Sequence, residues 1–171
     1  IYPNLSTRDD GSHGSHVSGI IGAVGNNATL GVGVAWHVGL VPLKAFNGCG
    51  TGTTSDIIKA LDWATAHGIK ITNNSWSGGG ASQSLLASLN AFCAAGGIFV
   101  VSAGNSGLNI DTTTWYPIDL GAECMLAVAA TDQNDALASF SNWGPTKVAV
   151  AAPGVNIYST VPTGYLCSGL S

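Results

Sequence analysis

The chain has 171 residues, enough for one domain with a hydrophobic core, and 46% of them are hydrophobic. Only 8% are charged and the net charge is −4, so no basic patch could bind nucleic acid or an anionic membrane surface. No apolar run is long enough to predict a membrane span. A chain so poor in charge and rich in Gly, Ser, Thr and Asn favours a secreted, extracellular protein.

Hydrophobic periodicity predicts an alternation of helices and strands along the whole chain. The first expected element is a helix that starts near His13, with Val17, Ile20, Ile21 and Val24 on one face. Further helices are expected over 56–67 and around 85–93, and strands are expected over 37–46, 69–76, 98–104, 125–131 and 147–154. We expect the second helix to be capped by Ser55 and stopped by Gly68.

This order of elements predicts an α/β fold. Strands that alternate with helices of this length form right-handed crossovers, so we expect three layers, with a mainly parallel central sheet and helices on both faces. Sites in such sheets gather at the carboxyl ends of the strands. The polar segments NNSWSGGG and SAGNSG follow two of the expected strands in this way.

The four cysteines, Cys49, Cys93, Cys124 and Cys167, are even in number and widely spaced. Without a CxxC pair, neither a zinc ribbon nor a thioredoxin-like redox site is expected. Two disulfides would allow three pairings, among which the spacing does not choose. Because Cys93 lies on an apolar helical pattern, a buried free thiol is an equally good interpretation of that residue.

His13 and His16 stand three residues apart in the segment HGSHVSG. Taken alone, His13 is best explained as a polar residue at a helix start. A shared metal is disfavoured, because HxxH differs from the HExxH spacing and no third ligand is evident. Asn105, in VVSAGNSG, is by itself a turn residue, but its amide also suits a donor to a developing oxyanion.

Six motifs taken together are more specific than any one of them. HGSHVSGIIGA, NNSWSGG, VVSAGNSG, ASFSNWGP, VAVAAPGVNIYST and SGLS occur in this order and resemble those of the subtilisin-like serine proteases, the subtilases. The resemblance runs from about Asp9 to Ser171, and the spacing between motifs also agrees with the family. It implies a serine endopeptidase that acts on protein or peptide substrates and is monomeric as the complete enzyme.

The resemblance assigns a role to each matching residue. His13 would be the general base, Ser171 the nucleophile and Asn105 the oxyanion donor, while His16 would be structural. The same match predicts a groove in which an extended peptide pairs as an added strand, with Tyr116-Pro117 near its floor. The expected groove residues are Ser75, Trp76, Ser77 and Gly78 on one wall, Ser102, Ala103 and Gly104 on the other, and Gly50 and Gly52 at the edge.

VGNNATLGVGVA resembles the tight calcium loop of the family. Asn26 and Asn27 are its only plausible side-chain donors, and an acidic ligand that the family draws from upstream is absent. The resemblance therefore implies a structural calcium ion, and no organic cofactor is expected.

Several departures from the family pattern affect what the chain is expected to do. The strand that carries the triad aspartate and the helices after the nucleophile are missing, so 1–171 is expected to be a partial catalytic domain, inactive in isolation. Asp10 lies too close to His13 to be the triad acid. Leu170 replaces the usual Thr, which keeps open an alternative function as a pseudoprotease or peptide-binding domain. The groove segments hold no acidic residue, and Trp76 narrows an apolar subsite, so an apolar or broad preference is expected.

Overall fold

The computed structural model describes residues 8–29 and 31–164 of the chain. These residues belong to two compact units, one formed by 1–60 and 158–171 and the other by 61–157. The sheet lies in the second unit.

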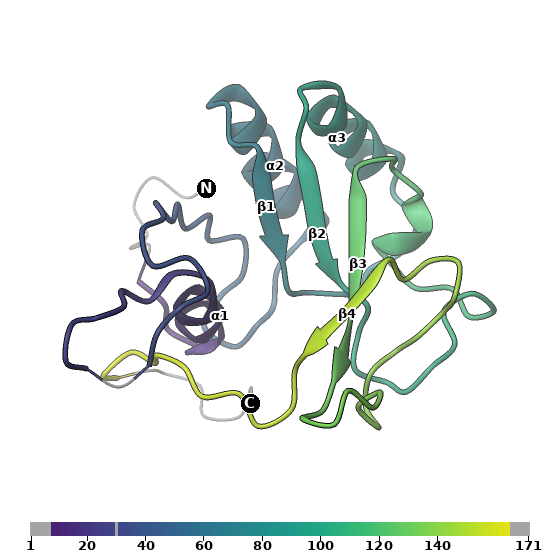
Figure 1. Cartoon of the computed structure of the whole chain (residues 1–171). Coiled ribbons are helices and arrows are strands. Elements are labelled where there is room, and N and C mark those ends of the chain that lie inside the picture. Colours follow the sequence, from purple (N-terminus) through teal and green to yellow (C-terminus); the bar gives the residue numbers. More distant parts are fainter. Residues whose placement is uncertain (1–7, 30, 165–171) are drawn as a thin grey trace. The chain divides into compact units, whose positions relative to one another are not determined.

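The second unit is built on a four-stranded parallel sheet in the order β1-β2-β3-β4 (Figure 1). The strands are β1 (Ile71–Asn74), β2 (Ile98–Ser102), β3 (Met125–Thr131) and β4 (Val150–Pro153). Each strand predicted within 61–157 is present, and β3 has the predicted bounds. The carboxyl ends of β1, β2 and β3 therefore reach one edge of the sheet.

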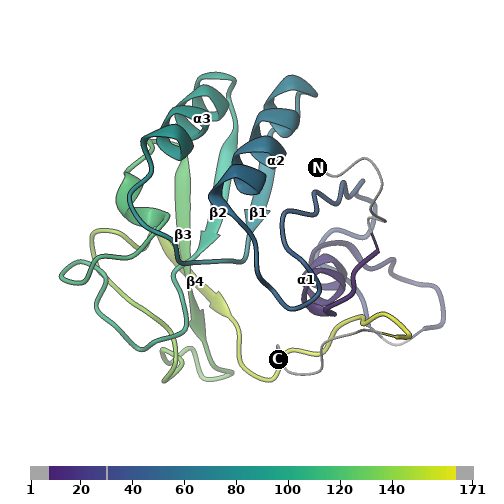
Figure 2. The same ribbon diagram turned by 180° about the vertical axis from the view of Figure 1, so that it is seen from behind.

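Helices α2 (Thr54–Ala66) and α3 (Gln83–Ala94) run along the same face of this sheet, as Figures 1 and 2 show from opposite sides. Their apolar faces and the strand residues that meet them make the core, in which Leu89, Phe92 and Phe99 have no exposed surface. The α/β fold with a parallel sheet predicted from the sequence is confirmed, although helices were expected on both faces of the sheet and α2 and α3 share one.

Capping residues determine where these helices begin and end. The Ser82 hydroxyl accepts a hydrogen bond from the Leu85 amide at 3.2 Å and starts α3. α2 starts two residues earlier than a cap at Ser55 would allow, because Thr53 Oγ1 accepts from the Asp56 amide and donates to the Asp56 carboxylate at 2.7 Å. The predicted cap at Ser55 is thus wrong by two positions. Gly68 ends α2, as predicted, with a φ of 71° that favours glycine.

The first unit contains α1 (His13–Gly22), which begins where the sequence predicts. Val24 lies beyond the end of this helix and is exposed, so its predicted place on the apolar face of the helix is wrong. The predicted strand over 37–46 is also wrong, because only Phe46 forms a bridge, to Gly52, and Val38, Leu40 and Val41 are exposed. A strand exists only when a partner accepts its hydrogen bonds, which an apolar composition cannot supply.

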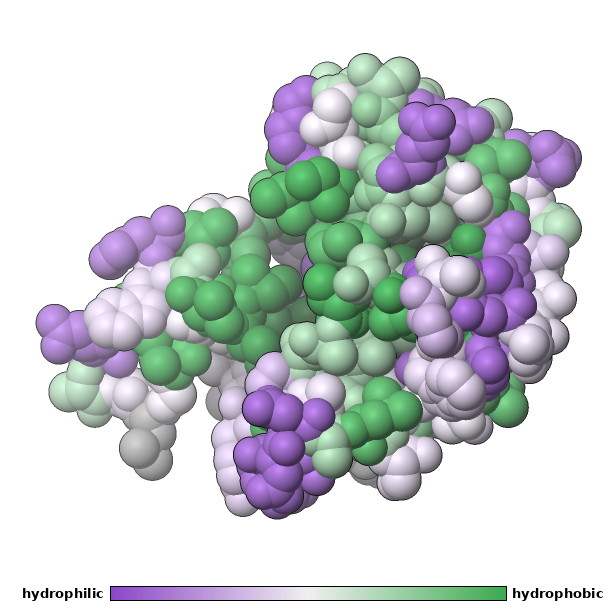
Figure 3. Space-filling model, turned by 45° about the vertical axis from the view of Figure 1, so that its right-hand side comes forward, coloured by the Kyte–Doolittle hydropathy of each residue, from purple (hydrophilic) through white to green (hydrophobic). Residues whose placement is uncertain are grey.

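Large hydrophobic side chains reach the surface in both units, and Figure 3 shows in green the areas that they form on one side of the molecule. In the part of the chain that the structure describes, no helix has the length and apolar character needed to cross a bilayer.

Cys93 and Cys124 form a disulfide that joins the end of α3 to the residue before β3. The interpretation of Cys93 as a free thiol is therefore wrong: the apolar pattern around it marks a helix face packed beside the sheet, where the second cysteine also lies. Cys49 is disulfide-bonded as well. Cys167 lies outside the described residues.

We expect removal of the 93–124 disulfide by the double substitution Cys93→Ala and Cys124→Ala to destabilise the protein. The bond closes a loop with a sequence separation of 31 residues. Loop-closure entropy then predicts a loss of about 3–4 kcal/mol in the free energy of unfolding. Denaturant unfolding of the gene product measures this, and substitution is preferable to a reductant because Cys49 is bonded too. An unchanged unfolding midpoint would contradict the prediction.

Candidate active site

The parallel pairing of β1 and β2 places two of the predicted groove segments side by side. Asn74 pairs with Val101 at the ends of the two strands, so 75–78 and 102–104 leave the sheet at the same edge. The Trp76 ring meets Phe99 edge-on, with ring centroids 6.2 Å apart, and its Nε1 donates to Asn74 Oδ1. The structure therefore brings these two predicted walls together within the second unit.

The segment 115–117 lies against both walls. The Gly78 amide donates to the Tyr116 carbonyl at 3.1 Å, which joins the first wall to this segment. A methyl group placed on Gly104 would lie 2.5 Å from Trp115 Cζ2, so the indole covers Gly104 closely. Trp115 Nε1 is buried and has no hydrogen-bond partner among the described residues. Sequence reasoning placed Tyr116-Pro117 near the pocket floor and missed Trp115.

Asn105 stands on the loop that follows β2, and its side chain is exposed. On either side of it, the backbone is held by Asn142, a fully buried residue. Asn142 Nδ2 donates to the Ala103 carbonyl at 2.9 Å, and its Oδ1 accepts from the amides of Ser106 and Leu108, both at 3.0 Å. Sequence reasoning missed Asn142: the motif ASFSNWGP included it only as a point of resemblance, and no periodicity marks it.

The loop between Asn105 and β3 is held by a network of charges. Lys147 Nζ forms an ion pair with Asp119 at 2.5 Å and donates to the Ile110 carbonyl at 2.7 Å. The hydroxyl of Thr146 and the backbone amides of Thr146 and Lys147 donate to Asp111, and these hydrogen bonds lower the pKa of its carboxyl. This network fixes the segment that carries Trp115 and Tyr116.

His13 is the first residue of α1, and Asp9 caps that helix from outside. Ser12, at the N-cap position, has a φ of 72° and makes no side-chain cap. The Asp9 carboxylate takes that role by accepting from the amides of Ser15 at 2.6 Å and Gly11 at 3.0 Å. Burial by itself raises the pKa of Asp9, but these hydrogen bonds outweigh it and hold the pKa below its ordinary value.

Asp10, the neighbouring carboxylate, has a different partner. It forms an ion pair with Lys44 at 2.5 Å, and Lys44 Nζ also donates to the Arg8 carbonyl. A carboxylate engaged in this way supports the prediction that Asp10 is not the acid partner of His13.

The chain that leads toward Ser171 runs along α1 within the first unit. The Thr160 hydroxyl donates to the Ser15 carbonyl at 2.9 Å and the Ser159 hydroxyl donates to the His16 carbonyl at 2.6 Å. A methyl group on Gly19 would lie 2.3 Å from Thr160 Oγ1, so only glycine allows this approach. The segment just past β4 is thereby tied to the first turn of the helix that begins with His13.

The third groove segment, with Gly50 and Gly52, forms a tight turn in the first unit. Asn47 Oδ1 accepts from the amides of Cys49 and Thr51, both at 3.0 Å. Gly50 has a φ of 75°, and a methyl group on Gly52 would lie 2.6 Å from the Ala45 carbonyl oxygen. Turn geometry therefore requires both glycines, independently of any role in a groove.

The described part of the predicted calcium loop offers only neutral oxygen donors. Asn27 Oδ1 already accepts from the Thr29 amide at 3.1 Å, and the side chains of Asn26 and Asn27 are exposed. Calcium takes six to eight oxygen ligands and usually several carboxylates, and residues 22–34 contain no acidic residue. Across 8–29 and 31–164, no group of three or more His, Cys, Asp or Glu side chains is placed to hold a metal. Calcium binding by Asn26 and Asn27 stays a prediction.

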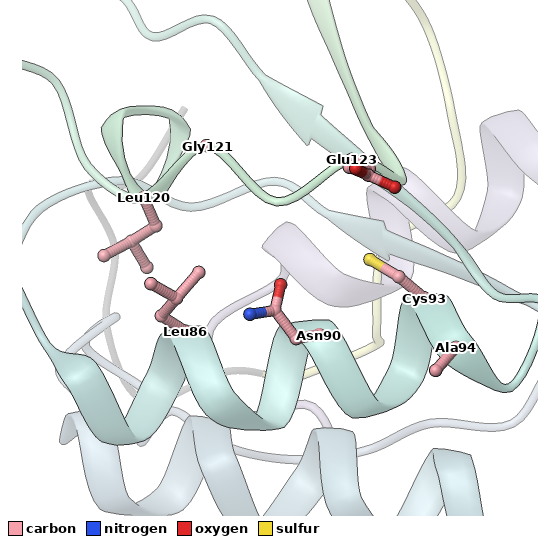
Figure 4. A pocket seen from close by; sticks show the side chains of 7 residues that line it. All are labelled: Leu86, Asn90, Cys93, Ala94, Leu120, Gly121 and Glu123. Atoms are coloured by element: carbon pink, nitrogen blue, oxygen red, sulfur yellow. The ribbon is translucent and has the colours of Figure 1, made fainter.

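One sizeable pocket lies away from these residues. It has a volume of about 540 Å³ and lies between α3 and the segment 120–123, where Leu86, Asn90, Leu120 and Glu123 line it (Figure 4). This segment precedes β3, so the pocket is beside the start of that strand, whereas the predicted walls follow the ends of β1 and β2. It has no buried charged group and belongs to no predicted motif.

The predicted catalytic residues fall in three places. His13 is an exposed residue of the first unit and Asn105 an exposed residue of the second, while Ser171 lies outside the described residues. Their convergence on one point, and the joining of the Gly50–Gly52 edge to the two walls, stay predictions.

Comparison with known proteins agrees with the motifs. The sequence model of peptidase S8, described as the subtilase family, matches residues 1–169. Subtilisin DY of Bacillus licheniformis is 40% identical over 156 residues, which cover 91% of this chain and 56% of that protein. Subtilisin Savinase of Lederbergia lenta is 37% identical over 157 residues, which cover 92% of this chain and 56% of that protein.

A solved structure extends the match to the fold. The crystal structure of a cold adapted subtilisin-like serine proteinase superposes with a TM-score of 0.76 at 32% identity, covering 90% of this chain and 52% of that one. The chain thus spans little more than half the length of these relatives.

We expect Asp9→Ala to destabilise the start of α1 in a pH-dependent way. Because the folded-state pKa of Asp9 lies below its ordinary value of 3.8, its contribution is complete above that value and is lost as the pH falls through the lowered pKa. Loss of an N-terminal cap predicts a decrease of about 1 kcal/mol in the free energy of unfolding at pH 7. The difference from wild type should vanish at strongly acid pH. Urea unfolding at a series of pH values measures it, with exposed Glu123→Ala as the control, and a pH-independent difference would contradict the assignment.

Proposed function

Because this chain belongs to the subtilase family, we propose that the protein is a secreted serine endopeptidase that hydrolyses peptide bonds in protein substrates. The observation that carries the proposal is the family match over residues 1–169, which includes His13 and Asn105 within their motifs. Ser171 lies just beyond that match, so its role rests on the SGLS motif alone.

The proposed reaction passes through an acyl-enzyme. The Ser171 hydroxyl attacks the scissile carbonyl carbon while His13 takes its proton, and the Asn105 amide donates to the oxyanion that develops. His13 then returns the proton to the leaving amine, and a water molecule releases the acyl group by the same steps in reverse order. In support, Thr160 and Ser159 tie the chain on the way to Ser171 to the helix that begins with His13.

The walls at the carboxyl ends of β1 and β2 would bind the substrate. Segments 75–78 and 102–104 leave neighbouring strands together, and the small side chains of their Ser, Ala and Gly residues permit an extended peptide to approach the backbone. No acidic side chain occurs in either wall to select Lys or Arg, so the proposed preference for the residue before the scissile bond is apolar or broad.

We expect the full-length gene product to hydrolyse casein and to react with a fluorophosphonate at Ser171. Substitution of Ser171 or His13 by alanine should lower kcat by about 10⁴- to 10⁶-fold, on the precedent of subtilisin, a member of the same family. His16→Ala is the matched control, since its imidazole has no assigned chemical role. A folded wild-type protein whose Ser171 stays unlabelled would refute the proposal, and peptide binding without hydrolysis would favour the pseudoprotease alternative.

We expect Trp115→Ala to enlarge the pocket that binds the residue before the scissile bond, so that larger side chains are accepted there. The indole covers Gly104 in the second wall, so its removal opens space there. Relative kcat/KM for Phe or Leu over Ala at that position should rise by about 10-fold. Matched peptide substrates measure this ratio. Trp63→Ala is the control, because Trp63 lies on α2 and stacks on His67, just past the end of that helix. An unchanged ratio would show that Trp115 does not limit the pocket.

A further inference from the structure

The loop that bears Asn105 is held by one buried side chain from a distant part of the sequence. Asn142 has no exposed surface, and all its polar side-chain atoms are used. Its Oδ1 accepts two amide hydrogens and its Nδ2 donates to a carbonyl, so the reverse orientation of the carboxamide would place donors against donors. The orientation of this side chain is therefore determined by its partners.

The partners of Asn142 lie immediately before and after Asn105. Two of these partners precede Asn105. The Ala103 carbonyl accepts from the Asn142 side chain, and the Gly104 carbonyl accepts from the backbone amide of Asn142 at 2.8 Å. The Ser106 and Leu108 amides stand after Asn105. Asn105 is the exposed residue between two points of attachment, which limits how far its backbone can move.

Asn142 is itself held to the sheet. The Ser141 hydroxyl accepts from the Ala130 amide of β3 and donates to the Asn142 carbonyl, each at 2.9 Å. A methyl group on Gly104 would lie 2.5 Å from Asn142 Nδ2, so the loop has no room to shift toward this side chain. The loop is thus attached to β3 as well as to the end of β2.

We propose that Asn142 is a positioning residue for catalysis, whose buried carboxamide holds the backbone of 103–108 so that the Asn105 amide points at the oxyanion. The inference rests on the proposed function, because it assumes that Asn105 is the oxyanion donor. Preorganised donors stabilise a transition state because they need no reorganisation when charge develops. A loop free to move would lose that advantage even with Asn105 intact.

The test is a double-mutant cycle between positions 142 and 105 in the full-length enzyme. Asn142→Ser should lower kcat by about 10-fold, by misplacing the donor, and leave KM within about twofold. Asn105→Ala should lower kcat by about 10²- to 10³-fold, the loss found for the corresponding amide in subtilisin. In the Asn105→Ala background, Asn142→Ser should lower kcat by less than about twofold, because there is no donor left to position.

Titration with a fluorophosphonate gives the concentration of active sites, so that kcat is not confused with a loss of folded enzyme. Asn134→Ala, on the exposed turn after β3, is the matched control and should leave kcat unchanged. Equal losses of kcat from Asn142→Ser in both backgrounds, or a rise in KM alone, would overturn the inference. If Asn105→Ala leaves kcat unchanged while Ser171 is still labelled, the positioning role fails but the proposed hydrolase function stands.

A measurement on the wild-type protein keeps the inference testable if Asn142→Ser does not fold. The amides of Ser106 and Leu108 should exchange with solvent slowly, although both residues are exposed, because each donates to Asn142 Oδ1. Exchange of either amide at the rate of an unstructured peptide would show that the loop is not held.

Discussion

The parallel register between β1 and β2 is the constraint on which the candidate site depends. It runs from Ile71 opposite Ile98 to Asn74 opposite Val101, so both strands end at one edge. A slip of one residue would move Phe99, which has no exposed surface, to the other face of the sheet, and would separate the two walls. Burial of one aromatic ring thus specifies where the polar loops emerge.

Neither the loop with Asn105 nor the helix start at His13 relies on its own segment alone for rigidity. The loop is held by Asn142 from beyond β3, and the helix is capped by Asp9 and contacted by Ser159 and Thr160 from beyond β4. The two exposed residues with predicted catalytic roles are therefore held by hydrogen-bonded partners, of which Asn142, Ser159 and Thr160 are distant in sequence. Such an arrangement would leave their side chains accessible to solvent while it restrains their backbones.

The sequence predicts correctly the elements that are stabilised by burial of their own apolar residues. Its predictions are wrong where an element or a cap depends on a hydrogen-bond partner from another residue or segment. β3 was predicted with its bounds because MLAVAAT is a nearly continuous apolar run, and Ala127 and Ala129 are buried on one face of the sheet. Residues 37–46 carry a similar run and form no strand, because pairing depends on another segment. Thr53 and Ser55 both have hydroxyl side chains that suit a helix N-cap, so the sequence does not distinguish them. Only the hydrogen bond from the Asp56 amide shows that Thr53 caps α2.

The same distinction explains why the resemblance could assign roles to His13 and Asn105 but none to Asn142. A motif identifies residues by the chemistry of their side chains, and an imidazole or an exposed amide has a recognisable use. The carboxamide of Asn142 acts on backbone groups, which every residue has, so its partners cannot be inferred from residue types. Its function becomes visible only when hydrogen bonds at 2.9 and 3.0 Å connect it to Ala103, Ser106 and Leu108. A structure therefore adds most to a family assignment by showing which backbone groups the buried polar side chains contact.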